Sequence, residues 1–177
     1  MSEAELSKHK KVSDILGFVK SGNLNMVHNL IKYHKLDQAV LLLKGLAVDF
    51  SFSKTEKVSM ADWNPLLLAI AFKHVDMVRY FLQEQKISLR QAGCKPGIDY
   101  GEVEEELLEK QTFCLALAIA NKDSTMLQEL WTANYTVWEE PHIRKVVQLL
   151  IASKWTQGLQ TVLKSYTTEM IFASMNY

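Results

Sequence analysis

The sequence predicts an all-α protein, built as a solenoid of about four helix-pair repeats with long finger loops. Three observations favour this class. Apolar residues recur at intervals of three and four along most of the chain, which is the helix period. Only 7 Gly and 3 Pro interrupt the 177 residues. A set of apolar positions also recurs along the chain, which is the signature of a repeat array.

The first predicted helix covers 12–20 and ends at Gly22, a residue that tolerates the left-handed conformation of a helix terminus. Two further apolar stripes follow at 27–31 and 36–43. Later helices come in pairs of about 9 to 12 residues per helix, too short to be stable alone in water, so they must pack on one another. The predicted pairs are 64–72 with 75–82, 113–121 with 124–131, and 142–153 with 156–163. Polar connections separate the pairs at 46–63, 83–112 and 132–141.

An internal repeat relates these pairs. Aligning Asn64 with Phe113 brings eight apolar positions into one register, including Met77 with Met126. A further copy lies 32 residues on, where Gly158 falls at the Met77 position. A weaker copy begins near Asn25, 39 residues upstream.

The residues of the best copy carry a resemblance to a known family. They are Asn64-Pro65-Leu66-Leu67-Leu68-Ala69-Ile70-Ala71, followed by His74-Val75-Asp76-Met77-Val78. This stretch resembles an ankyrin repeat, whose signature is Thr-Pro-Leu-His-x-Ala followed by a second helix. The resemblance implies a divergent ankyrin-like array over 25–164, since the spacings of 39, 49 and 32 depart from the family period of 33.

The boundaries of the array follow from this register. Residues 1–24 are expected to form an N-terminal capping helix, 83–112 an insertion, and 165–177 a C-terminal capping segment. The inter-helix positions that are Gly in the family are then His34, Lys73, Lys122 and Lys154, at a cost of about 1 kcal/mol each if left-handed. An alternative register pairs 12–20 with 23–34 as an additional unit around Gly22. The residues alone leave both registers open.

The resemblance also implies where a protein partner binds, namely the tips of the fingers and the concave face of the first helices. Aromatic residues at such places are frequent anchors of binding energy. Phe72 is expected to form an exposed apolar centre on this face, between Tyr33 and Asn121. The alternative for the connection aromatics is that they fold back onto their own hairpins. The candidate partner-binding residues are Tyr33, Trp63, Phe72, Asn121, Tyr135 and Trp138.

Charge limits the kinds of partner. The chain has 20 Lys+Arg and 20 Asp+Glu, and this zero balance argues against a nucleic-acid partner. A nucleic-acid adaptor remains the rival among binding proteins, and its candidate residues are Lys8, Lys10, Lys11, Arg144 and Lys145. The acidic run 102–109 is either a solvated helix face or a docking segment for a basic partner.

Catalytic signals are absent from the sequence. Its five His are scattered, Cys94 and Cys114 lack the spacing of a zinc site, and Gly-rich phosphate loops and Ser elbows are missing. The longest apolar runs have eight residues, too few for membrane insertion. We therefore expect a cytoplasmic, non-enzymatic adaptor or scaffold subunit of a larger assembly, with no cofactor and no metal. The alternative is a helical ligand-binding protein or enzyme with a site in an inter-helix groove.

Overall fold

The computed structural model describes residues 2–42, 49–51, 57–59, 64–93, 104–133 and 138–164. Nearly all of these residues are helical, which confirms the all-α class. The two short strands pair antiparallel, with Phe50 opposite Val58. The elements in order are α1 (Glu3–Ser21), α2 (Leu24–His34), α3 (Gln38–Leu41), β1 (Asp49–Ser51), β2 (Lys57–Ser59), α4 (Pro65–Ala71), α5 (Val75–Arg79), the π-helical η2 (Tyr80–Glu84), α6 (Leu89–Ala92), α7 (Glu104–Gln111), α8 (Phe113–Ala120), α9 (Ser124–Ala133), α10 (Glu140–Ala152) and a helix at 156–164.

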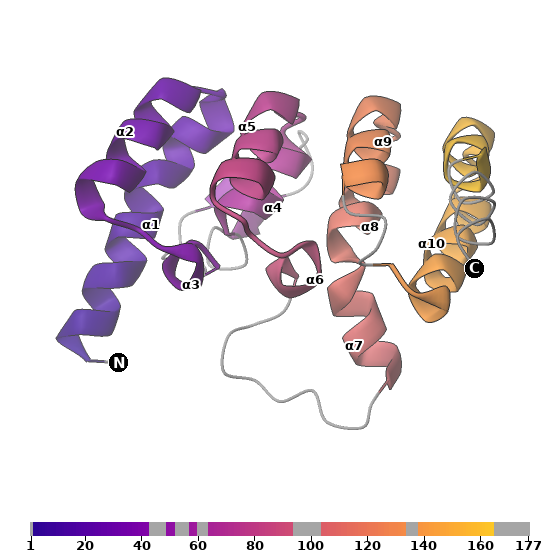
Figure 1. Cartoon of the computed structure of the whole chain (residues 1–177), viewed down its shortest axis with the longest axis horizontal. Helices are drawn as coiled ribbons and strands as arrows, with labels where there is room; N and C mark the ends of the chain where they lie inside the picture. The colour runs from indigo at the N-terminus through magenta and orange to yellow at the C-terminus, as the bar shows by residue number, and fades with distance from the viewer. Residues whose placement is uncertain are drawn as a thin grey trace, which may run out of the picture.

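The long helices form four antiparallel hairpins that stand side by side (Figure 1). The first hairpin is α1 with α2, the second α4 with α5 and η2, the third α8 with α9, and the fourth α10 with the helix at 156–164. Along the row, α1 packs on α4, α4 packs on α8, and α8 packs on α10. Each hairpin therefore buries its apolar stripe mainly against the hairpins next to it in sequence.

Every hairpin turns at one left-handed residue, which we call its joint. The joints are Gly22, Lys73, Lys122 and Lys154, with φ of 75°, 63°, 48° and 56°. The residue after each joint donates its N–H back into the first helix. At the second joint, for example, the His74 N–H reaches Ala69 O at 3.0 Å. This bond satisfies a carbonyl that the end of the helix would otherwise leave without a partner.

The three Lys joints are where the repeat predicts them, but the first joint is Gly22 and not His34. The structure thus follows the alternative register, in which α1 and α2 form one hairpin, and the predicted boundary at residue 24 falls inside it. The apolar residues of 27–31 lie in α2, which is the second helix of the first hairpin. Helix α2 ends at another left-handed residue, Lys35. Lys86 is the corresponding left-handed residue of the second hairpin. Lys35 and Lys86 each lie thirteen residues after the joint of their own hairpin.

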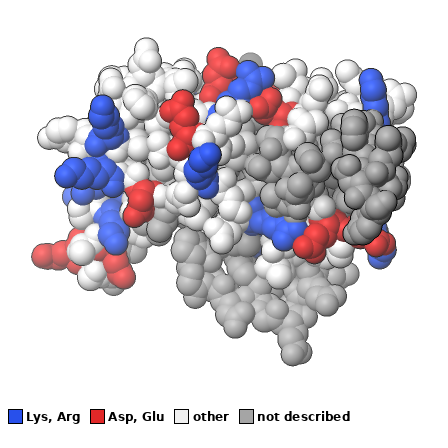
Figure 2. Space-filling model, in the orientation of Figure 1, with Lys and Arg blue, Asp and Glu red and all other residues white. Residues whose placement is uncertain are grey.

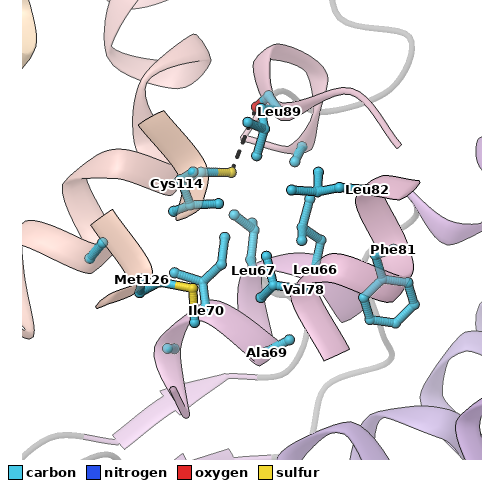
Figure 3. Packing of buried hydrophobic residues seen from close by; sticks show 14 of the residues in the cluster. Leu66, Leu67, Ala69, Ile70, Val78, Phe81, Leu82, Leu89, Cys114 and Met126 are labelled. Atoms are coloured by element: carbon cyan, nitrogen blue, oxygen red, sulfur yellow. Dashed lines mark hydrogen bonds between the residues drawn. The ribbon is translucent and has the colours of Figure 1, made fainter. Parts of the chain in front are cut away.

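Counting from the joints reveals the structural repeat. Three residues before the joint lie Val19, Ile70, Ile119 and Ile151. Four residues after it lie Met26, Met77, Met126 and Gly158, and nine residues after it lie Ile31, Leu82, Trp131 and Leu163. Figure 3 shows how these positions interlock between the second and third hairpins, where Ile70 and Met126 lie together in the core.

One polar residue ties this core to the segment that follows the second hairpin. Asn64, fully buried, caps α4 by accepting the Leu67 N–H at 3.0 Å, and donates from Nδ2 to Ala92 O at 2.7 Å. A buried amide with both ends bonded avoids the penalty of an unsatisfied polar group. Cys114 closes the same corner by donating from Sγ to Leu89 O at 3.6 Å (Figure 3).

The exception in the repeat, Gly158, has a structural reason. A Cβ at Gly158 would lie 2.3 Å from the Trp155 ring, so the indole fills the space that Met fills in the other hairpins. Trp155 is itself buried and takes the place of His74 and Asp123, one residue after the joint. The fourth hairpin therefore exchanges a large residue in the helix for one at the turn.

Candidate interaction surface

Successive hairpins are linked at the edge where their joints lie, which we call the turn edge. His74 donates from Nε2 to Lys20 O at 2.7 Å, joining the second hairpin to the first. Asn121 donates from Nδ2 to Ala71 O at 3.1 Å, joining the third to the second. Both acceptors are carbonyls two residues before a joint. These bonds therefore fix the spacing of the hairpins along the row.

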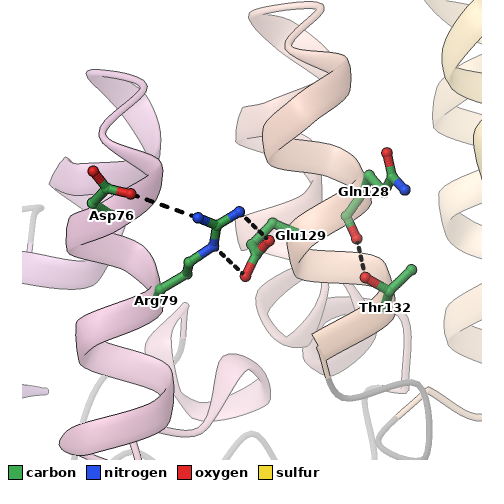
Figure 4. Close-up of polar contacts among 5 residues, drawn as sticks. All are labelled: Asp76, Arg79, Gln128, Glu129 and Thr132. Carbon is green, nitrogen blue, oxygen red and sulfur yellow. Dashed lines mark hydrogen bonds and ion pairs between the residues drawn. The ribbon is translucent and has the colours of Figure 1, made fainter.

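The second helices carry a matching set of links. Tyr80 hydrogen-bonds from its hydroxyl to His28 Nδ1 at 3.1 Å, and the same hydroxyl accepts from Gln85 Nε2 at 2.9 Å. Burial raises the pKa of the Tyr80 hydroxyl, so it stays protonated near neutral pH. Arg79 reaches Glu129 in the third hairpin through Nε at 3.0 Å and Nη2 at 3.1 Å (Figure 4).

The His28–Tyr80 and Arg79–Glu129 contacts join equivalent positions of the repeat. The residue six after one joint, His28 or Arg79, contacts the residue seven after the next joint, Tyr80 or Glu129. Asp76 adds a second carboxylate to the Arg79 pair at 3.6 Å. The chemistry differs between the two interfaces, but the geometry of the repeat is the same.

Phe72 does not form the exposed apolar centre that the sequence predicts. Its side chain is half-buried against the core, and the Lys20 Nζ lies 5.6 Å from the ring centroid. Asn121 is also half-buried, held by its bond to Ala71. Both residues directly precede a joint, where their hairpin contacts the preceding hairpin at the turn edge. They therefore connect hairpins and do not present an open surface.

Tyr33, by contrast, has 79% of its surface exposed, the largest value among the described large apolar residues. Its ring meets the His34 ring edge-on at 5.1 Å. It lies near the end of α2, about 15 Å along the helix from the turn at Gly22 at 1.5 Å per residue. The predicted grouping of Tyr33 with Phe72 and Asn121 is therefore not formed.

Trp138 is buried and does not act as an exposed anchor. Only 6% of it is accessible, and its ring stacks on Trp131 with centroids 6.3 Å apart and planes 7° apart. His142 meets the same ring edge-on at 5.9 Å. In the alternative prediction, connection aromatics fold back onto their own hairpins; Trp138 does fold back, but its described ring contacts are with Trp131 of α9 and His142 of α10. Trp63 and Tyr135 lie outside the described residues.

His142 is a polar core residue that the sequence analysis did not single out. It donates from Nε2 to Gln111 Oε1 at 2.7 Å and accepts the Glu139 N–H at Nδ1, at 3.2 Å. Burial lowers the pKa of His142 below 6.5; Arg90 lowers this pKa further and Glu139 opposes the shift. The neutral imidazole thus joins α7 to the start of α10. The only sequence signal is Glu139 three residues ahead of it, the spacing of a capping box.

Residues 104–109 of the acidic run lie in α7, whereas 102 and 103 and the side chains of 104–106 lie outside the described set. The basic residues of the nucleic-acid hypothesis do not form one patch. Lys8 and Lys10 lie on α1 and Arg144 on α10, at opposite ends of the row (Figure 1), and Arg144 pairs with Glu140 at 2.9 Å. Lys and Arg are interspersed with Asp and Glu on the face in Figure 2.

Within the described segments, no group of three or more His, Cys, Asp or Glu is placed to hold a metal ion. None of the helices searched there combines the length and apolar character needed to cross a bilayer.

Comparison with known proteins gives no match: neither a family model, nor a curated protein, nor a solved structure resembles this chain closely enough to identify it. The function proposed below therefore depends on the geometry and on the sequence resemblance to ankyrin repeats.

Proposed function

We propose that this chain is a divergent ankyrin-type array that acts as a non-enzymatic protein-interaction module, an adaptor or scaffold subunit. The supporting observation is the recurrence of equivalent core positions through four helix hairpins in a row. Such an array holds its surface rigid by contacts between neighbours and exposes a long flank for binding. The capped, proline-led start of α4 and the left-handed joints agree with the family resemblance.

Tyr33 is the residue we propose as the main described anchor for a partner. A tyrosine offers a large, rigid ring and a hydroxyl that can hydrogen-bond at the rim of an interface. At 79% exposure it has most of its surface available to bury. Phe72 and Asn121 act indirectly in this proposal, since they hold the hairpins that carry the surface.

The test is affinity capture of proteins by the full chain, with wild type and Tyr33→Ala compared side by side and the bound proteins identified. We expect Tyr33→Ala to reduce capture of one specific partner about tenfold or more, as truncation of a binding hot spot does. The change of Tm should stay at about 2 °C or less, because the side chain is exposed.

Lys32→Ala is the matched control, because Lys32 is an exposed neighbour on the same helix. It should retain the partner. Equal capture by wild type and Tyr33→Ala would remove Tyr33 from the site. A larger stabilisation by a nucleotide, metal ion or metabolite than by any protein would contradict the adaptor function itself.

A further inference from the structure

The outer face of the fourth hairpin exposes apolar residues at positions that the other hairpins bury. Three residues before the joint, Val19, Ile70 and Ile119 are 0%, 0% and 4% exposed, but Ile151 is 61% exposed. The cause is the order of the row. In the first three hairpins the following hairpin packs on this side, and the described row ends with the fourth.

A second position gives the same result independently. Nine residues after the joint, Ile31, Leu82 and Trp131 are 4%, 7% and 3% exposed, whereas Leu163 is 44% exposed. Ile151 lies on α10 and Leu163 on the helix at 156–164, so both helices of the fourth hairpin contribute. Together they reproduce the surface that an internal hairpin offers to its successor. We call it the end face.

The opposite end of the row is built differently. Eight residues before the joint, Pro65, Cys114 and Val146 are buried, but the first hairpin has the exposed Asp14 there. Five residues before the joint it has the exposed Gly17. A polar outer side is what a terminal repeat needs for solubility. Among the described residues, the first hairpin exposes Asp14 and Gly17 at these positions, whereas the end face of the fourth exposes Ile151 and Leu163.

The charge of the fourth hairpin limits which proteins could bind the end face. The fourth hairpin, 140–164, contains four cations, Arg144, Lys145, Lys154 and Lys164, and one acid, Glu140, which pairs with Arg144. Pairing of two end faces from two copies would bring these like charges together, which disfavours it. Pairing of an end face with the other end of a second copy would set Ile151 against the polar Asp14 side. Neither mode of self-association suits the end face.

We propose that the end face docks a helical hairpin of another protein, one with an apolar first helix and acidic residues along its flanks. This surface is separate from Tyr33 and goes beyond the proposed function. The internal interfaces predict its polar contacts. Gln160, six residues after the joint, occupies the place of His28 and Arg79 and would bond to the partner's second helix. The carbonyl of Ala152 occupies the place of the Lys20 and Ala71 acceptors.

Two measurements on the full chain establish whether the end face is open. We expect Ile119→Asp to lower Tm by about 10 °C or more, because it buries a charge, and Ile151→Asp to change it by about 2 °C or less. Sedimentation should give a monomer. An equal loss in both variants would mean that the chain covers its own end face, for example with the apolar 165–177. A dimer that Ile151→Asp dissociates would mean that a second copy covers it. Either result overturns the proposal.

Docking is measured with a designed probe, a two-helix peptide closed by a disulfide. Its apolar pattern copies the third hairpin, and glutamates line its flanks. We expect micromolar binding by fluorescence anisotropy, weakened about tenfold or more by Ile151→Asp and also by a probe with lysine flanks. Gln157→Asp is the matched control, because this position is exposed in all four hairpins, as Asn25, Asp76, Thr125 and Gln157.

Retention of binding by Gln157→Asp, with loss in Ile151→Asp, supports the proposal. Three results overturn it: no binding of the probe, equal weakening by both variants, or equal binding of the lysine-flanked probe. Tyr33→Ala should leave probe binding unchanged, so failure here and failure of the proposed function can be told apart.

Discussion

Lysine occupies every positive-φ position of the described chain that is not glycine, namely Lys35, Lys73, Lys86, Lys122 and Lys154. An L-residue in this conformation costs about 1 kcal/mol or more because its Cβ approaches the backbone. Each of these lysines also follows the carboxyl end of a helix, where a positive charge meets the negative end of the helix dipole and regains about 0.3 to 1 kcal/mol. Lysine is therefore a tolerable substitute for the glycine that this turn prefers.

A pair of variants at Lys122 separates these two effects. Both Lys122→Ala and Lys122→Gly remove the charge, but only glycine removes the Cβ. We expect the glycine variant to have the higher free energy of unfolding, by about 1 kcal/mol, in urea denaturation. Equal stability of the two variants would show that the backbone at this joint is not strained.

Gly22 is the joint where glycine is retained, and the reason is twofold. Its φ is 75°, and a Cβ there would approach the His74 ring to 2.9 Å. We expect Gly22→Ala to lower the free energy of unfolding by about 1 to 2 kcal/mol. Gly17 in the same helix is the control, since a Cβ there has no neighbour within 4 Å. Gly17→Ala should raise the free energy of unfolding by up to about 1 kcal/mol, and a loss in both variants would contradict this account.

At the scale of elements, periodicity located the helices that bury a stripe and missed those that do not. The predicted 64–72, 113–121 and 142–153 correspond closely to α4, α8 and α10. The first helix begins at Glu3 and not near residue 12, because a capping box between Ser2 and Glu5 starts it on polar residues without a stripe.

The short α6 lies inside the predicted insertion and could not be found by its pattern. It is held by tertiary contacts, above all at Gly93, where a Cβ would lie 2.1 Å from Lys110 O. The buried packing of Trp138 on Trp131 was equally hidden, because a tryptophan in a connection has the same local sequence whether it is buried or exposed. Burial of this kind is decided by contacts between segments distant in the sequence.

The contact between α7 and α10 predicts a pH dependence. His142 is held neutral by burial, so its pKa in the folded state is below the unfolded value of about 6.5. The unfolded chain then binds more protons, and the free energy of unfolding should fall as the pH drops below about 6.5 through the folded pKa. The charges of Arg90 and Glu139 act on this pKa in opposite directions, Arg90 lowering it and Glu139 raising it.

His142→Gln tests the assignment, because glutamine can hydrogen-bond but does not titrate. Urea denaturation of both proteins between pH 7.5 and 5 should show a smaller decline for the variant, although its stability at pH 7.5 is lower. Parallel declines would mean that another group governs the pH dependence. These pH limits bracket the ordinary His pKa of about 6.5.

At the scale of the whole molecule, the row of hairpins makes stability a sum of local units and neighbour contacts. The second and third hairpins have neighbours on both sides, and every residue of α4 is buried. The first and fourth hairpins have one neighbour each in the described row, and the end face leaves Ile151 exposed. Opening from the ends should therefore require less free energy than opening in the middle.

Amide hydrogen exchange of the full chain, read by mass spectrometry, measures this gradient. We expect the slowest exchange in α4 and α8 and faster exchange in α2 and at 156–164, because end hairpins can open without disrupting a second interface. Ile119→Asp should accelerate exchange in the third hairpin and in its neighbours more than in α1, since coupling decays along the row. Uniform exchange in all four hairpins would instead mean that the molecule opens as one cooperative unit, with no independent behaviour of the end that carries the proposed docking face.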